Sequence, residues 1–117
     1  MKIEKITNEH VLFDNGSKIT FDHEENCCEY NYADFPQLED TGVEQEEFKE
    51  PLIFESAGSG FRFGNKGKMY FVPCYSAQNG YYTTEVDIYY DGKCVCYTYG
   101  ELEDEYSNKI NKKRSHL

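Results

Sequence analysis

The sequence has little that would direct the chain to a membrane or out of the cell. Its longest apolar run, near residues 71–75, is far shorter than the roughly 20 residues that a membrane-spanning helix needs. The first residues lack the basic stretch followed by an apolar stretch that marks a secretory signal. Five cysteines, an odd number, do not suit a disulfide framework. We therefore expect a cytoplasmic protein with reduced thiols and no membrane partner.

The Cys-x2-Cys spacing common in zinc sites is also missing. His23, Cys27 and Cys28 lie close together in the chain and are candidate ligands. The residues that would complete such a site are distant cysteines: Cys74, Cys94 and Cys96. Adjacent residues on a strand point to opposite faces, so Cys27 and Cys28 do not readily share one metal ion. The main hypothesis therefore includes no cofactor, and a metal or small-ligand site at His23, Cys27 and Cys28 is the alternative.

No recognisable catalytic motif occurs. A thiol nucleophile would have to pair one of these cysteines with His23, and no third group is placed in sequence to orient that histidine. The carboxylates nearby raise the pKa of a thiol, which makes it a weaker nucleophile. The sequence favours a non-enzymatic protein. A small enzyme with a carboxylate or cysteine site is the rival hypothesis. It is less favoured because clusters of carboxylates are usually solvated faces.

Basic residues are few, and the net charge of −10 is unevenly distributed. Residues 22–50 hold eleven acids and one base, Lys49, whereas residues 56–84 hold no acid at all. Four glutamates concentrate this charge: Glu44, Glu46, Glu47 and Glu50. Such a surface repels nucleic acid and attracts cations, so we expect no direct nucleic-acid binding and a basic protein partner.

The pattern of the chain predicts one domain over residues 1–117, with a core in residues 3–99. Short runs of aromatic and β-branched residues separated by turn signals indicate strands. The strand predictions are residues 2–7, 11–22 as a hairpin, 29–35, 52–55, 61–63, 68–77, 81–90 and 93–99. The expected fold is mainly β (α+β), an antiparallel meander or small sandwich. Exposed edge strands would permit a dimer, but the oligomeric state is not determined by the sequence.

Two hairpins allow the pairing of side chains to be worked out. For the first, a three-residue loop with Gly16 in the left-handed conformation pairs Val11 with Ile19 and puts the apolar residues on one face, so we prefer it to an Asn15-Gly16 turn. For the second, a two-residue loop at 91–92 pairs Ile88 with Val95. This register also pairs Val86 with Tyr97 and Thr84 with Tyr99, and turns Cys94 and Cys96 away from the core.

Two helices are expected beside the strands. Thr41-Gly42-Val43-Glu44 fits a capping box, which predicts a short helix near residues 42–49 that ends before Pro51. The tail, residues 101–117, has apolar residues four apart, with acids first and bases last, as a helix dipole favours. This predicts a C-terminal helix near residues 101–113.

Two motifs give the chain a resemblance to a known family. Cys27-Cys28-Glu29 follows a predicted strand, and Gln78-Asn79-Gly80-Tyr81-Tyr82 lies between strands. In their order and spacing, after a hairpin like residues 12–21, they resemble a family of small proteins of gut bacteria and their bacteriophages, a domain of unknown function. The resemblance covers residues 3–99. It implies an accessory protein of phage or mobile-element origin, and it carries no activity over to this chain. Our main hypothesis is macromolecular binding through the acidic region, residues 22–50.

Overall fold

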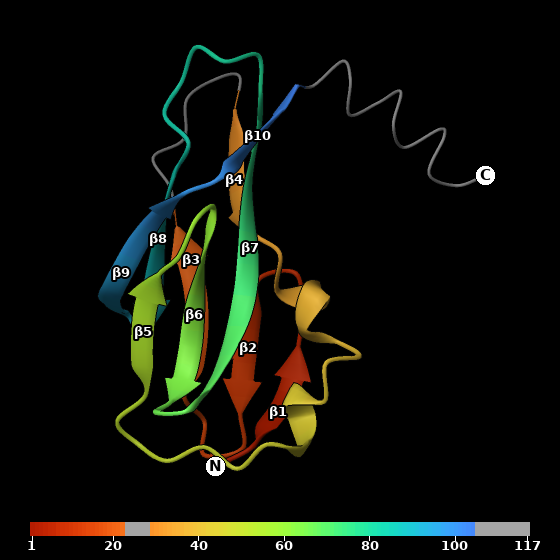
Figure 1. The fold of residues 1–117 in the computed structure, drawn as a ribbon, viewed down its shortest axis with the longest axis vertical. Coiled ribbons are helices and arrows are strands. Elements are labelled where there is room, and N and C mark those ends of the chain that lie inside the picture. The colour runs from red at the N-terminus through yellow and green to blue at the C-terminus, as the bar shows by residue number, and fades with distance from the viewer. Residues whose placement is uncertain (23–28, 105–117) are drawn as a thin grey trace, which may run out of the picture.

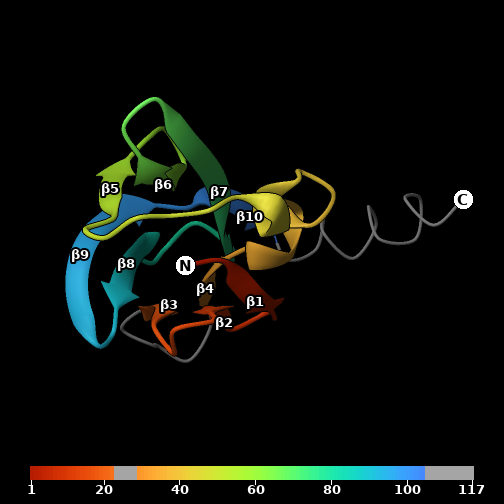
Figure 2. The same ribbon diagram turned by 90° about the horizontal axis from the view of Figure 1, so that it is seen from below.

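The chain folds into two β-sheets packed face to face (Figures 1 and 2). The computed structural model describes residues 1–22 and 29–104. The first sheet has the order β1 (Ile3–Ile6), β2 (His10–Phe13), β3 (Lys18–Asp22), β8 (Glu85–Tyr90) and β9 (Lys93–Tyr99). The second has the order β10 (Glu101–Asp104), β7 (Lys68–Gln78), β6 (Gly60–Asn65) and β5 (Ile53–Ser56), and β4 (Tyr30–Ala33) also pairs with β7. The mainly β fold class is confirmed.

The core lies between the two sheets. Alternation along each strand points every second side chain inward, so each sheet supplies one apolar face. The fully buried side chains of the first sheet are Val11, Phe13, Ile19, Val86 and Ile88, and those of the second are Phe61, Phe63, Val72 and Cys74. Connecting segments and β4 add Ala33, Phe35, Leu38, Val43 and Phe48.

The first hairpin forms in the preferred register. Val11 lies opposite Ile19, and the Phe13 amide donates to the Ser17 carbonyl oxygen at 2.9 Å. Gly16 has a φ of 91°, in the left-handed region that glycine enters without steric cost. Local turn chemistry and the apolar pattern were therefore sufficient to predict this part of the fold.

The second hairpin corrects the predicted register. Asp91 and Gly92 form the expected two-residue turn, with φ of 50° and 82°. Beyond it, however, Ile88 pairs with Cys96 instead of Val95, because one extra residue in β9 makes a bulge. The remaining pairs shift by one, so Val86 lies opposite Thr98 and Glu85 opposite Tyr99.

The bulge changes which side chains of β9 face the core. Thr98 is buried, while Tyr97 and Tyr99 are each 55% exposed on the outer face. Cys96 is half-buried and packs against the core, so the prediction that both cysteines turn away from it is wrong for Cys96. Cys94 is exposed, as predicted.

Strand β7 is the central element of the second sheet. Its first half pairs with β6 as far as Pro73, and its second half pairs with β4 antiparallel and with β10 parallel. The chain passes from β9 in one sheet to β10 in the other through Gly100. A Cβ there would lie 2.7 Å from the carbonyl carbon of Tyr75, so only glycine allows this close crossing.

The helix prediction near residues 42–49 is wrong, and the prediction near residues 101–113 is wrong for its first four residues. Residues 101–104 form β10, because the edge of β7 offers them backbone partners from Tyr75 to Gln78, and the rest of that predicted helix lies outside the described residues. In place of a helix over 42–49 there is a 3-10 turn, η2 (Val43–Gln45), followed by extended chain. A second 3-10 turn, η1, spans Phe35–Leu38. No helix in the described part of the chain has the length and apolar character to cross a membrane.

A buried polar cluster connects the two sheets where β4 and β7 face β8. The side chains of Asn31, Ser76 and Gln78 have no solvent exposure. The Asn31 amide donates to the carbonyl oxygens of Thr83 at 2.9 Å and Glu85 at 3.1 Å, and its own oxygen accepts from the Ser76 hydroxyl. The Gln78 amide donates to Ser76 and to Thr83. The cluster fixes the chain that enters β8.

Candidate binding surface

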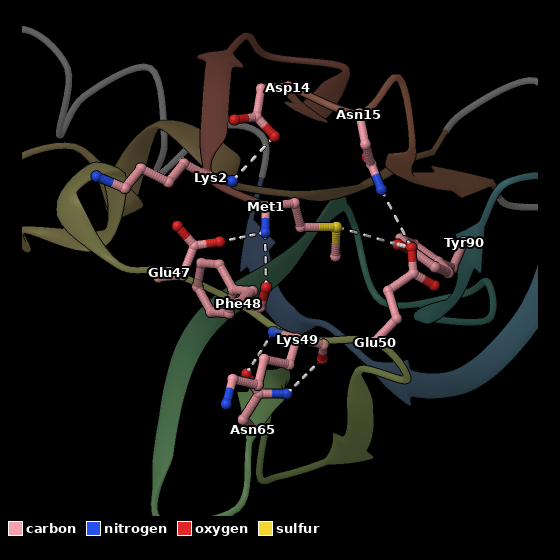
Figure 3. Close-up of polar contacts among 10 residues, drawn as sticks. All are labelled: Met1, Lys2, Asp14, Asn15, Glu47, Phe48, Lys49, Glu50, Asn65 and Tyr90. Atoms are coloured by element: carbon pink, nitrogen blue, oxygen red, sulfur yellow. Dashed lines mark hydrogen bonds and ion pairs between the residues drawn. The ribbon is translucent and has the colours of Figure 1, made fainter.

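Three of the four glutamates singled out by the sequence hold residues 46–50 against the sandwich, and Figure 3 shows two of them, Glu47 and Glu50. Glu46 accepts a hydrogen bond from the Tyr70 hydroxyl at 2.8 Å and lies 3.4 Å from the Lys68 ammonium. Glu47 pairs with the amino group of Met1. Glu50 accepts from the Asn15 amide and the Tyr90 hydroxyl, both at 3.2 Å. These carboxylates have structural contacts within the protein.

The amino terminus is part of the same arrangement (Figure 3). The Met1 ammonium donates to the carbonyl oxygen of Phe48 at 2.7 Å, and the Phe48 amide donates to the Met1 carbonyl oxygen at 2.7 Å. The Asn65 side chain makes two hydrogen bonds with the backbone of Lys49. Its oxygen accepts from the Lys49 amide, and its nitrogen donates to the Lys49 carbonyl oxygen. The end of the acidic region is therefore anchored along its backbone.

Four other acids of the same region, Asp34, Glu39, Asp40 and Glu44, have no cationic partner among the described residues. Glu39, Asp40 and Glu44 are exposed, and Asp34 is partly exposed. The ion pairs found over residues 1–22 and 29–104 involve Glu46, Glu47 and Glu55 instead. Within the described part of the acidic region, residues 34–44 therefore present carboxylates that are available to another molecule.

The alternative ligand set, His23, Cys27 and Cys28, lies outside the described residues. Of the cysteines that would complete it, Cys74 is buried, Cys94 is exposed and Cys96 is half-buried. Because the β9 bulge turns Cys96 inward, these last two do not share one face. Within the described ranges, no three histidine, cysteine or acidic side chains are grouped so as to hold a metal ion.

The three described cysteines should differ in their rate of alkylation. Burial raises the pKa of the Cys74 thiol to about 12 and that of Cys96 to about 11, so few thiolates form at pH 8. We expect iodoacetamide to label Cys94 first, Cys96 more slowly, and Cys74 only on unfolding. Peptide mapping by mass spectrometry measures each site separately. Equal labelling of Cys94 and Cys74 in the folded protein would contradict the burial of the Cys74 side chain.

Tyrosines and carboxylates gather on the outer face of β4, β7 and β10. We call this the tyrosine–carboxylate face, and it consists of Tyr30, Tyr32, Asp34, Tyr75, Glu101 and Glu103. Tyr30 stacks on Tyr32, with ring centroids 5.0 Å apart and planes at 19°. Tyr32 is the cross-strand partner of Tyr75, and their rings lie 5.6 Å apart. The three rings make a continuous aromatic surface.

Strand pairing brings the carboxylates beside these rings. Glu101 lies opposite Tyr75, and Glu103 lies opposite Ala77, whose small side chain leaves room for the Tyr32 ring to cross β7. The Tyr32 hydroxyl donates to Glu103 at 3.1 Å. Asp34 follows Tyr32 on the same side of the chain and accepts from the Gln37 amide at 3.2 Å.

The electrostatics of the face raise the pKa of two of its tyrosines, Tyr32 and Tyr75. Burial, and then the Glu103 carboxylate, raises the pKa of Tyr32 well above its usual value. Burial also raises the pKa of Tyr75, with Asp34, Glu101 and Glu103 adding to the effect. A negative field over neutral, electron-rich rings is an environment that stabilises a cation.

The sequence indicated only part of this face. The alternation of residues 29–35 put Tyr30, Tyr32 and Asp34 on one side of a strand, and the structure confirms that arrangement. The other members of the face join them because β4 and β10 both pair with β7, which no local signal specified. These members are Tyr75 on β7 and Glu101 and Glu103 on β10. The parallel pairing of β10 was hidden by the helical spacing of the tail.

Beside these rings lies a concave site of about 210 Å³. The residues that line it are Asn8, Tyr30, Tyr32, Ala33, Asp34 and Pro36. Comparison of the chain with protein-family models, with curated proteins and with solved structures finds no match, so the site is interpreted from its own chemistry.

Proposed function

We propose that this protein acts by binding a basic segment of a partner protein through its acidic region, residues 22–50. The observation that carries the proposal is the set of acids over residues 34–44 that have no cationic partner in the described part of the chain: Asp34, Glu39, Asp40 and Glu44. Glu46, Glu47 and Glu50 support the segment by anchoring it, and they are not assigned a direct contact with the partner.

Electrostatics provide the physical reason for this assignment. A net charge of −10 attracts cations over several ångströms and repels nucleic acid and other anionic surfaces. Carboxylates at a surface contribute more to the rate and selectivity of association than to its final affinity. The expected binding is therefore fast, selective for basic segments and weakened by salt. The cytoplasmic location and the phage or mobile-element origin expected from the sequence remain predictions.

A matched pair of double variants tests the proposal. Glu39→Gln with Glu44→Gln removes two exposed carboxylates from the acidic region. Glu85→Gln with Asp87→Asn removes two from the outer face of β8, a rival acidic surface in the other sheet. We expect the first variant to weaken binding of a labelled ten-residue lysine peptide by about threefold to fivefold, because two screened charge contacts are lost.

Fluorescence anisotropy at low and physiological salt measures this effect. The Glu85/Asp87 variant has the same net charge as the Glu39/Glu44 variant but keeps the carboxylates of residues 34–44. It should therefore bind like the wild-type protein. If the wild-type protein does not bind the peptide, or if both double variants are weakened equally, binding through residues 34–44 is disproved. Circular dichroism of each variant checks that the fold is retained.

A further inference from the structure

The chain contains two Asn-Gly pairs, Asn15-Gly16 and Asn79-Gly80, and each lies in an exposed loop. Asparagine is a thermolabile residue, because the next backbone nitrogen in the chain can attack its side-chain amide. The attack is easiest when that next residue is glycine, which carries no side chain to shield its nitrogen. The two pairs are equally exposed but differ in their hydrogen bonds, and this difference predicts different reactivity.

Hydrogen bonds hold both reacting groups of the first pair. The Asn15 side-chain oxygen accepts from the Ser17 amide at 3.0 Å, and its side-chain nitrogen donates to Glu50 at 3.2 Å. The Gly16 amide donates to the Phe13 carbonyl oxygen at 2.9 Å. The Gly16 nitrogen can therefore reach the Asn15 side chain only after these hydrogen bonds have opened.

The second pair lies in the loop between β7 and β8, at the opposite end of the molecule from the amino terminus (Figure 1). Over residues 1–22 and 29–104, no hydrogen bond involves the Asn79 side chain or the Gly80 amide. A Cβ on Gly80 would have the Leu102 side chain as its nearest neighbour, at 3.8 Å, so the space around this glycine is open. An exposed loop without such bonds is a part of the fold that rearranges at little cost.

We infer that Asn79 is a site of spontaneous deamidation in the folded protein, whereas Asn15 is protected. The Gly80 nitrogen gives its proton to a solvent base and bonds to Cγ of Asn79. The bond from Cγ to Nδ2 breaks, and Nδ2 takes a proton from solvent and leaves as ammonia. Water then opens the cyclic imide, at Cγ to give aspartate or at the backbone carbonyl carbon to give isoaspartate. One water is consumed, one ammonia is released, and nothing is oxidised or reduced.

The reaction takes place inside a loop whose two ends are tied together. The buried Gln78 side chain, immediately before Asn79, accepts from the Tyr82 amide at 2.7 Å and donates to the Thr83 carbonyl oxygen at 3.0 Å. Isoaspartate puts an additional carbon atom into the backbone between these ends, whereas aspartate adds only a charge. We therefore expect isoaspartate at residue 79 to weaken the bond between Gln78 and the Tyr82 amide.

Ageing of the purified protein at neutral pH and physiological temperature tests the inference. Peptide mapping by mass spectrometry measures the conversion of each asparagine, and electron-transfer fragmentation separates isoaspartate from aspartate. We expect Asn79 to convert at least about tenfold faster than Asn15, because Asn15 reacts only after its hydrogen bonds open. In protein unfolded with guanidinium chloride the two rates should become similar. Equal rates in the folded protein, or an Asn79 that reacts only on unfolding, would overturn the inference.

Asn79→Asp is the matched control for the effect on the loop, since it adds the same charge and leaves the backbone unchanged. Anion exchange separates the aged, deamidated protein from unreacted protein, and amide hydrogen exchange compares it with Asn79→Asp. The Tyr82 amide should exchange faster in the aged protein, because only that sample contains the lengthened backbone. Equal exchange of this amide in the two samples would disprove the effect on the loop.

Discussion

Phe48→Ala is expected to lower the free energy of unfolding by about 3–5 kcal/mol, the usual cost of deleting a buried aromatic ring. Phe48 is 1% exposed and contacts rings from three parts of the fold. Its ring centroid lies 5.7 Å from those of Phe13 and Phe63 and 5.9 Å from that of Tyr70. The loss would leave a cavity between the two sheets, since a close-packed core relaxes only in part.

Urea denaturation followed by circular dichroism measures this change. Phe71→Ala is the matched control, because the Phe71 side chain is 48% exposed on the outer face of β7. It should cost about 1 kcal/mol or less, since little apolar area leaves water at that site. Equal losses for Phe48→Ala and Phe71→Ala would contradict the insertion of the Phe48 ring into the core.

Asn31→Ala is expected to destabilise the protein by about 3 kcal/mol, because buried polar groups lose their partners. The carbonyl oxygens of Thr83 and Glu85 lose the amide donor, and the Ser76 hydroxyl loses its acceptor. The cost of an unsatisfied buried group exceeds the benefit of the average hydrogen bond, so the effect should be large for a small change in side-chain volume.

Thermal unfolding and amide hydrogen exchange check this second prediction. The Tyr82 amide, which donates to the Gln78 side chain at 2.7 Å, should exchange faster in Asn31→Ala, because Gln78 bonds to Ser76, a partner of Asn31. Asn79→Ala, an exposed asparagine at the start of the same loop, should change stability by less than about 0.5 kcal/mol. Indistinguishable curves for the two variants would show that the cluster does not hold the sheets together.

The β-rich fold and its first hairpin could be predicted because their signals are local. The Asp14-Asn15-Gly16 turn and the apolar alternation around it specify the register without reference to distant residues. The same argument worked for Tyr30, Tyr32 and Asp34 of the candidate site, because period-two alternation alone puts them on one face.

The register of β8 and β9 could not be obtained in this way. The two-residue turn forms and places Tyr89 opposite Cys94, but the β9 bulge then shifts all three pairs that the sequence predicted. Thr98, turned inward by that shift, donates at 3.3 Å to the carbonyl oxygen of Gly58, in the turn between β5 and β6 of the opposite sheet. The hairpin sequence alone would have turned Tyr97 inward. In the structure Thr98 is turned inward instead, and it makes a contact between the two halves of the sandwich.

The segment around Phe48 shows the same limit for helix prediction. A capping-box pattern at Thr41 favours a helix, and the residues that follow are mostly good helix formers. In the folded chain the Phe48 ring enters the core and its backbone pairs with Met1, so this part of the segment is extended. The burial of one aromatic ring and two backbone hydrogen bonds outweighs the small preference of each residue for a helix.

The sequence by itself determined the strand content, the local turns, the excess of negative charge and the alternation that puts Tyr30 and Tyr32 on one face of a strand. Those properties depend on neighbouring residues or on composition. Only the tertiary structure decided which of the described carboxylates have no cationic partner in residues 1–22 and 29–104, which face of β9 is buried, and that β10 joins β7 beside the tyrosines. Each of these depends on contacts between residues far apart in the chain, and their free energies exceed the local preferences that a sequence pattern can express.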